Sequence, residues 1–249
     1  MHAAKHPQMS VAAAIALWAL LCIPAHAAEL ITFFNPAPAA SGLTLQSTDS
    51  AHTTAQSAYL ETVSIAPAGA SGKLIVLAVS PGTNAAPACT YAGSETFTQG
   101  AAAAFASNVW TYIYYLVPSA GSGVIRVTPS ASTEVVLTWY CFSGAQATPG
   151  AAATDYVTGG MTLTRSLTTG TAASIVVTAC TLGTDAISGD AVTNGSQANY
   201  HKETSTSYLV ANLLTSTLLT TTAGSYTTGF AWTESSNGNI AALEIRPAP

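Results

Sequence analysis

Charged side chains are scarce in this sequence. They make up 7% of its 249 residues, with 6 Lys and Arg against 11 Asp and Glu and a formal net charge of −5, whereas about a quarter of a typical domain is charged. The few basic residues are scattered, so no basic patch could neutralise phosphates, which argues against nucleic acid as a partner. Ser, Thr, Ala and Gly replace the missing charge. A surface of hydroxyls and methyls suits contact with a neutral material outside the cytoplasm.

Cysteine is also scarce. Four cysteines occur, and Cys22 lies in an N-terminal segment that we expect to be removed. The other three, Cys89, Cys141 and Cys180, are far apart in the sequence, unlike the closely spaced ligand pairs of structural zinc sites. Export would permit a disulfide, and the sequence leaves all three pairings among these candidates open.

Long apolar runs are absent except at the N-terminus. The apolar run at 11–23 is shorter than the roughly 20 residues that a membrane span requires. Lys5 precedes it, and Ala25-His26-Ala27 follows it as a small-residue cleavage site. This pattern predicts a secretory signal peptide over 1–27, with a membrane anchor as the alternative. We therefore expect residues 28–249 to be one secreted or periplasmic domain without a membrane span.

Amphipathic helices with caps are absent from residues 28–249. The segment consists instead of short runs rich in Val, Ile, Thr and Tyr, such as LIVLAVS (74–80), which Gly, Pro, Asn and Ser separate. Strands without intervening helices favour antiparallel pairing, so we expect an all-β, two-sheet antiparallel sandwich, jelly-roll-like. We expect the leucine-rich segment 207–219 to be a strand. The polar segment 184–206 is predicted to be one long loop.

The order of these segments resembles a loosely defined set of bacterial secreted β-sandwich domains. The resemblance covers about residues 60–249 and rests on short motifs: KLIVLAVS, CTYAGSETFTQ, VWTYIYYLVPSAGSGVIRVTPS, CFSGAQATPGAA and FAWTESSNGNIAALEIRPAP. The chain departs from the pattern at Ala92-Gly93, where two glycines are typical, and at Ala145-Gln146, which usually has an acidic residue nearby. The resemblance implies a sandwich fold and export. It offers no catalytic residues to map.

An aromatic row in VWTYIYYLVP (109–118) is the first candidate ligand-binding site. Alternate side chains of a strand share a face, so Trp110, Tyr112 and Tyr114 point to one side and Ile113 to the other. The indole and phenol groups need polar partners. The row could therefore stack against sugar rings, or it could pack beneath another part of the protein.

A metal site is a second candidate. Asp185 and Asp190, with Asn194 and Glu203, supply oxygen ligands of the kind that calcium prefers. The spacing of an EF-hand loop is absent, however. We retain Asp185 and Asp190 as candidate calcium ligands and expect no other cofactor.

Catalytic patterns are weak. The sequence has no G-x-S-x-G motif, and only two histidines, His52 and His201, follow the predicted signal peptide. A triad of His201 with Asp185 or Asp190 and a serine would be one arrangement. Glu95 and Glu134 could form a glycosidase pair, although Glu134 looks like the solvated start of a strand.

These observations together favour a non-catalytic exported sandwich that binds a neutral polymer or a cell surface, with carbohydrate as the leading ligand. Two alternatives stay open. The first is a structural subunit of an extracellular filament or matrix that assembles through strand edges. The second is a secreted hydrolase whose site the sequence does not reveal.

Overall fold

Antiparallel β-strands form the regular structure of the described part of the chain. The computed structural model describes residues 42–53, 57–68, 71–105, 109–183, 188–204 and 212–249. These residues form 15 strands and no helix, in three sheets. The predicted all-β class is therefore confirmed, and the antiparallel sheets are consistent with a β-sandwich.

The central sheet has five strands. Their order is β1 (Thr44–His52), β9 (Val135–Ser143), β3 (Leu74–Pro81), β7 (Val109–Leu116) and β6 (Thr98–Phe105). Every residue of β3 is buried, and so are all residues of β9 but the last. Burial of both faces explains why these strands read as continuous apolar runs instead of alternating ones.

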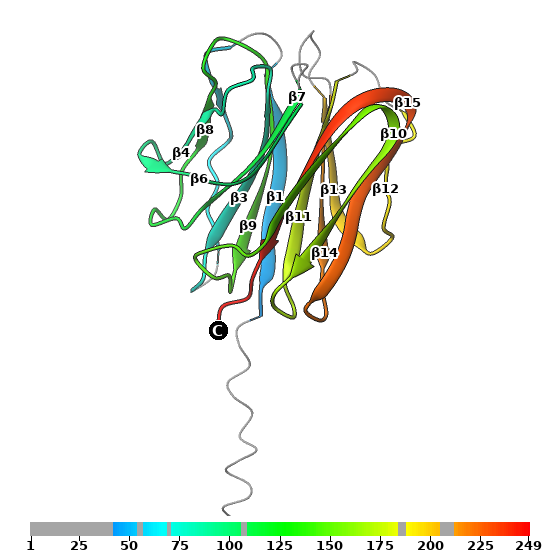
Figure 1. Ribbon diagram of the computed structural model, residues 1–249. Coiled ribbons are helices and arrows are strands. Elements are labelled where there is room, and N and C mark those ends of the chain that lie inside the picture. The colour runs from blue at the N-terminus through cyan, green and yellow to red at the C-terminus, as the bar shows by residue number, and fades with distance from the viewer. Residues whose placement is uncertain (1–41, 54–56, 69–70, 106–108, 184–187, 205–211) are drawn as a thin grey trace, which may run out of the picture. The chain divides into compact units, whose positions relative to one another are not determined.

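The large sheet lies on one side of the central sheet and the small sheet on the other (Figure 1). The order in the large sheet is β10 (Ala152–Thr169), β15 (Gly224–Ile245), β11 (Ile175–Leu182), β14 (Asn212–Leu219) and β13 (Gln197–Thr204), and β12 (Ala191–Val192) pairs with β15. The order in the small sheet is β2 (Leu60–Glu61), β8 (Ile125–Thr128), β4 (Ala88–Tyr91) and β5 (Glu95–Thr96).

One hydrophobic core lies on each side of the central sheet, between it and the covering sheet. Val76 of β3 points into the core shared with the large sheet, where it joins Val177 and Leu243. Its neighbour Leu77 points the opposite way, into the core shared with the small sheet, where it joins Val127. Truncating a side chain of this kind to alanine costs about 2–5 kcal/mol, so both cores fix the layers in place.

The long strands β10 and β15 form a fourth layer by bending back over the large sheet, as the arch in Figure 1 shows. At the bend, Gly160 pairs with Ser236, but Thr162 pairs with Ala231, so several residues of β15 are unpaired. Trp232 closes the gap by donating from its indole nitrogen to the carbonyl oxygen of Gly160 at 3.0 Å. Residues 162–169 and 224–231, beyond the bend, cover two further hydrophobic clusters on the other face of the large sheet.

The structure corrects two predictions. The sequence predicted two sheets, but the described residues form three, because both faces of the central sheet need a cover. The predicted loop 184–206 contains the strands β12 and β13. Its residues are polar because β13 is an edge strand with much of its surface in water. The strand predicted at 207–219 is confirmed over Asn212–Leu219.

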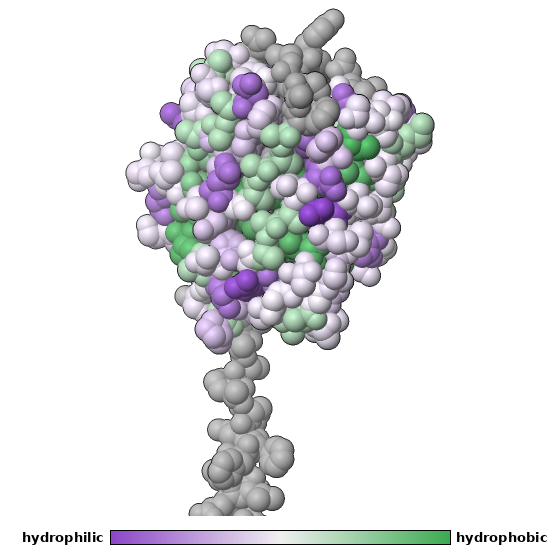
Figure 2. Space-filling view, viewed as in Figure 1, coloured by the Kyte–Doolittle hydropathy of each residue, from purple (hydrophilic) through white to green (hydrophobic). Residues whose placement is uncertain are grey.

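The N-terminal predictions concern residues outside the described part. The signal peptide over 1–27 and its cleavage after Ala27 therefore stay predictions. Within the described ranges, no helix has the length and hydrophobicity needed to cross a bilayer. On the face shown in Figure 2, most of the surface has near-neutral hydropathy and strongly hydrophilic residues are scattered, as the scarcity of charge predicts.

Candidate functional site

The predicted aromatic row lies on β7, in the interior of the protein. The ring centroids of Trp110 and Tyr112 are 6.0 Å apart, and so are those of Tyr112 and Tyr114. Tyr112 and Tyr114 are only 3% and 4% exposed, because the small sheet packs over them. The Tyr114 hydroxyl donates to the carbonyl oxygen of Pro87 at 3.1 Å. Of the three predicted ligand-binding residues, only Trp110 is partly exposed.

The three candidate disulfide cysteines are free thiols in the structure. Cys89, Cys141 and Cys180 are all buried. Burial raises the pKa of the Cys141 thiol to about 11, and it raises the pKa values of Cys89 and Cys180 as well. Thiols that stay protonated are poor nucleophiles, so the three cysteines act as small apolar side chains of the cores.

The two candidate calcium ligands are described only in part. Asp185 lies outside the described residues. Asp190 accepts a hydrogen bond from the Lys202 ammonium at 2.7 Å and another from the Tyr200 hydroxyl. No group of three or more His, Cys, Asp or Glu side chains within the described ranges is placed to hold a metal ion. The calcium site at Asp185 and Asp190 stays a prediction.

Glu203 of β13 lies beside β1 and joins the edges of the central and large sheets. Its carboxylate accepts hydrogen bonds from the Ser50 hydroxyl and from Nδ1 of His52, both on β1. Two residues away, Nε2 of His201 lies 3.0 Å from the Thr48 hydroxyl. The two histidines that follow the predicted signal peptide therefore occupy one interface, and no sequence motif indicated this contact.

The order of groups in this cluster differs from that of a catalytic triad. In a triad, a histidine lies between the carboxylate and the serine and takes the hydroxyl proton. Here the Glu203 carboxylate lies between Ser50 and His52 and accepts from both. His201 contacts Thr48 and not Asp190, which Lys202 and Tyr200 hold instead. The cluster joins β1 to β13 through these hydrogen bonds.

The predicted glycosidase pair is also engaged elsewhere. Glu95 accepts hydrogen bonds from the backbone amides of Ser119 and Ala120 at 2.7 and 2.8 Å. The Ser119 amide lowers the pKa of Glu95 most, so this carboxyl is not an acid near neutral pH. Glu134 is 1% exposed, which corrects the prediction that it starts its strand in water.

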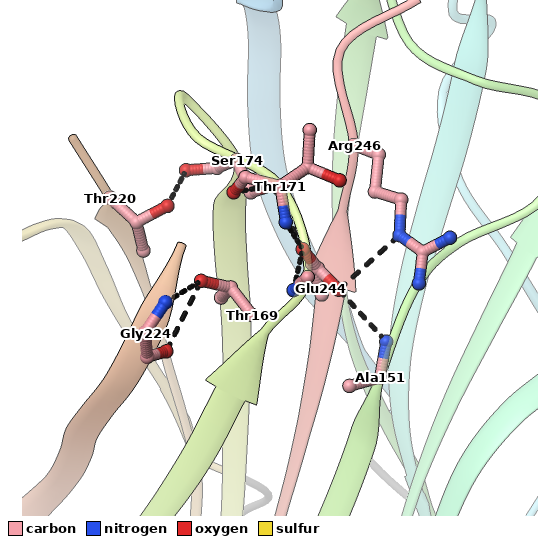
Figure 3. Close-up of polar contacts among 9 residues, drawn as sticks. Ala151, Thr169, Thr171, Ser174, Thr220, Gly224, Glu244 and Arg246 are labelled. Atoms are coloured by element: carbon pink, nitrogen blue, oxygen red, sulfur yellow. Dashed lines mark hydrogen bonds and ion pairs between the residues drawn. The ribbon is translucent and has the colours of Figure 1, made fainter. Parts of the chain in front are cut away.

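A second carboxylate, Glu244 near the end of β15, is completely buried. It accepts hydrogen bonds from five donors, drawn in Figure 3: the amides of Ala151, Gly170 and Thr171 at 3.0, 3.0 and 3.3 Å, the Ser174 hydroxyl at 2.9 Å and Nε of Arg246 at 3.3 Å. Burial alone would raise its pKa, but these hydrogen bonds outweigh burial and hold the pKa of Glu244 below its usual value. This carboxylate is a structural clamp.

A hollow on the outer face of the small sheet has a different character. The register of β2, β8, β4 and β5 places Glu61, Arg126, Thr90 and Thr96 side by side across the four strands. These residues alternate with the buried side chains that cover the central sheet, so they face outward. The hollow measures about 330 Å³, and its lining residues are Glu61, Thr90, Gly93, Val124, Arg126 and Thr128.

The guanidinium group of Arg126 organises this hollow. Its Nε and Nη2 lie 2.7 and 2.6 Å from Oε1 of Glu61. Its Cζ lies 4.5 Å from the ring centroid of Tyr59, a cation–π distance. Tyr59 is 48% exposed. The ring therefore fixes the guanidinium plane while both stay accessible to a ligand.

Gly93 keeps one side of the hollow open. Ala92 and Gly93 have φ values of 49° and 81°, which is the left-handed pair of a type I′ hairpin turn between β4 and β5. The Ser94 amide closes this turn by donating to the Tyr91 carbonyl oxygen at 3.2 Å. A Cβ atom on Gly93 would meet nothing within 4 Å, so the turn borders open space.

This arrangement is suited to hold uncharged polyols. Arg126 has five N–H donors, and only two of its nitrogens contact Glu61, both at Oε1. The other N–H groups and Glu61 Oε2 can donate to and accept from neighbouring hydroxyls of a ligand. The positive and negative charges balance, so neither an anion nor a cation is favoured over a neutral ligand.

Comparisons of this chain with protein-family models, curated proteins and solved structures found no match. The resemblance to secreted β-sandwich domains therefore stays a prediction.

Proposed function

We propose that the protein is an exported, non-catalytic β-sandwich of jelly-roll type that binds a neutral polymer, carbohydrate above all. The observation that carries the proposal is the hollow on the small sheet, where Arg126 lies between the Glu61 carboxylate and the exposed Tyr59 ring. An aromatic surface combined with a fixed donor–acceptor pair matches a sugar, which has apolar C–H faces and adjacent hydroxyls.

Other features support the same ligand class. The ion pair is exposed, with side-chain accessibilities of 48% and 35%, so it adds at most about 1 kcal/mol to stability and folding alone gives little reason for it. The hollow lies within the roughly 300–1,000 Å³ range of small-molecule sites. The described acidic and histidine clusters lack the order of groups that hydrolysis requires, which supports binding over catalysis.

Two binding assays of the processed protein test the proposal. The first measures retention on insoluble cellulose and chitin. The second is affinity electrophoresis in gels that contain soluble mixed-linkage β-glucan, galactomannan or arabinoxylan. The variants Tyr59→Ala and Arg126→Ala should each weaken binding at least about tenfold, since anchor side chains dominate binding energy. Leu219→Ala is the control, because Leu219 is 60% exposed on the remote large sheet and its loss should change nothing.

A Trp110→Ala variant separates this hollow from the aromatic row predicted from the sequence. If the hollow is the site, Trp110→Ala retains binding while Tyr59→Ala loses it. The reverse result would assign binding to the aromatic row. Equal binding by wild type, Tyr59→Ala and Arg126→Ala would reject the hollow as the site.

A further inference from the structure

A groove runs between the edges of the central and large sheets. It has a volume of about 410 Å³. One wall is Ala102, Ala103 and Ala104 of β6, the last strand of the central sheet, and the other is Thr154, Asp155 and Tyr156 of β10, the last strand of the large sheet. Small alanines on one wall leave room for a ligand, and Tyr156 is 55% exposed.

Both walls present backbone polar groups. Among the described residues, β6 pairs only with β7, and β10 pairs only with β15. The outer edge of each strand therefore carries N–H and C=O groups without a ladder partner. Hydroxyl groups of a ligand can bond to such edges from either side.

Neither edge is shaped to accept another strand. The register of β6 is broken between Gln99 and Ala101, and that of β10 is broken between Val157 and Gly160. Irregularities of this kind, and charged side chains such as Asp155, are devices that block edge-to-edge strand pairing. A compact hydroxylated ligand fits this groove better than an extended peptide or the edge of a second copy.

An ion pair lies on the face of β10 opposite to Thr154 and Tyr156, because alternate side chains of a strand point to opposite sides. Asp155 forms an ion pair with Arg165 at 3.4 Å, and the two side chains are 44% and 40% exposed. The exposed Tyr156 is the next residue on β10. The described residues include three arginines. Arg126 and Arg165 each pair with a surface carboxylate, and an exposed tyrosine lies near each pair. Arg246 instead pairs with the buried Glu244.

We propose that this groove is a second saccharide subsite, with Tyr156 as its aromatic surface and Thr154 and the two strand edges as its hydrogen-bonding groups. The inference rests on the proposed function, because it assumes the same class of neutral polymer. The small and central sheets separate the two subsites, and stacked sheets lie about 10 Å apart. The protein is thus bivalent and can join two segments of polymer.

Bivalency predicts a difference between polymers and short oligosaccharides. Two linked sites raise the apparent affinity for a polymer by roughly 10²–10⁴ over that of either site. Losing one subsite should therefore weaken polymer binding by about 10²-fold, while the remaining subsite still binds a short oligosaccharide. Loss of one subsite should also abolish cross-linking.

The test uses the processed protein with soluble mixed-linkage β-glucan, galactomannan and arabinoxylan, each assayed separately by affinity electrophoresis and light scattering. The variants are Tyr156→Ala and Ala104→Glu, which alter opposite walls of the groove, together with Tyr59→Ala and the double variant Y59A/Y156A. Met161→Ala is the matched control, since Met161 lies on the same strand, is 54% exposed and does not line the groove.

The expected result is that wild type and Met161→Ala both bind and cross-link one of these polymers. Each groove variant should keep weak retardation without cross-linking, and Y59A/Y156A should lose both. If Tyr156→Ala and Ala104→Glu cross-link as wild type does while Tyr59→Ala loses binding, the second subsite is refuted and the proposed function stands. Absence of retardation of wild type by every polymer would refute both. If the molecular mass of wild type rises with protein concentration and that of Ala104→Glu does not, the groove is instead a contact between two copies of the chain.

Discussion

Two carboxylates join distant segments of this protein, and they do so in opposite ways. Glu244 is completely buried and accepts from three backbone amides, a hydroxyl and Arg246. Glu203 is 17% exposed and is held by Ser50 and His52 across the gap between two sheets. The donors to Glu244 are amides, a hydroxyl and a guanidinium, whereas the junction around Glu203 also contains His201, whose pKa burial lowers.

Glu244 is therefore a buried clamp within one sheet, whereas Glu203 belongs to a partly exposed junction between two sheets. Glu244 fixes the turn between β10 and β11 to the end of β15, so its loss affects the large sheet itself. Glu203 fixes the edge strand β13 to β1, so its loss affects how two sheets meet. Substitutions at these two places should therefore differ both in size and in their dependence on pH.

The largest effect is expected for Glu244→Gln. The amide nitrogen of glutamine would face N–H donors, leaving buried donors without an acceptor, so we expect a loss of about 3–5 kcal/mol in the free energy of unfolding. Urea denaturation of wild type and variant at pH 7 measures it. A loss below about 1 kcal/mol would contradict the clamp.

The pH dependence of the same variant gives a second readout. Because the pKa of Glu244 in the folded protein lies below 4.5, its contribution is complete above pH 4.5 and is lost as pH falls through the lowered pKa. As pH falls below about 4.5, wild type should therefore lose stability more steeply than Glu244→Gln does.

Gly150→Ala should have the next largest effect. A Cβ at this position would lie 1.9 Å from Oε2 of Glu244 and 2.4 Å from Nε of Arg246, so both groups must move. We expect a loss of about 1–3 kcal/mol, as for overpacking in a core, measured by urea denaturation. Gly121→Ala is the control, because its Cβ would meet nothing within 4 Å, and equal effects of the two variants would argue against the clamp.

The strands and their burial followed from the sequence more readily than the contacts did. LIVLAVS was predicted as a strand and is completely buried as β3. Trp139 and Tyr140 of β9 point to opposite faces of their strand, and both are buried. Two faces of one strand are buried only when sheets cover both sides, and strand periodicity does not reveal how many layers stack.

The sites were less predictable because they depend on register. Glu61 and Arg126 are 65 positions apart in the sequence and meet only because β2 pairs with β8. The same holds for His52 and Glu203, since nothing in 184–206 showed that β13 lies beside β1. The aromatic row was predicted from the alternation of side chains along a strand, but whether a third sheet covers it is a matter of topology.

Glu203→Gln should have a smaller effect than either clamp variant. The amide can still accept one hydrogen bond, and the contact with His52 is partly exposed, so we expect a loss of about 0.5–1 kcal/mol at pH 7. Thermal unfolding followed by circular dichroism measures it. A loss as large as that of Glu244→Gln would remove the distinction between the two carboxylates.

The smallest expected effect on stability is that of a substitution at His201, and it should be visible only in the pH dependence of the melting temperature. Burial lowers the pKa of His201 in the folded protein, and the opposing attraction of Asp49 and Glu203 does not restore it. Below pH 6.5 the unfolded chain therefore binds more protons at this position than the folded chain, so stability falls as pH falls through this range. His201→Asn removes the titrating group, and the difference in melting temperature between pH 7.5 and pH 5.5 should shrink relative to wild type. Glu244→Gln should leave that difference unchanged, because its carboxyl titrates at lower pH; an equal change in both variants would show that His201 does not make the sheet junction sensitive to pH.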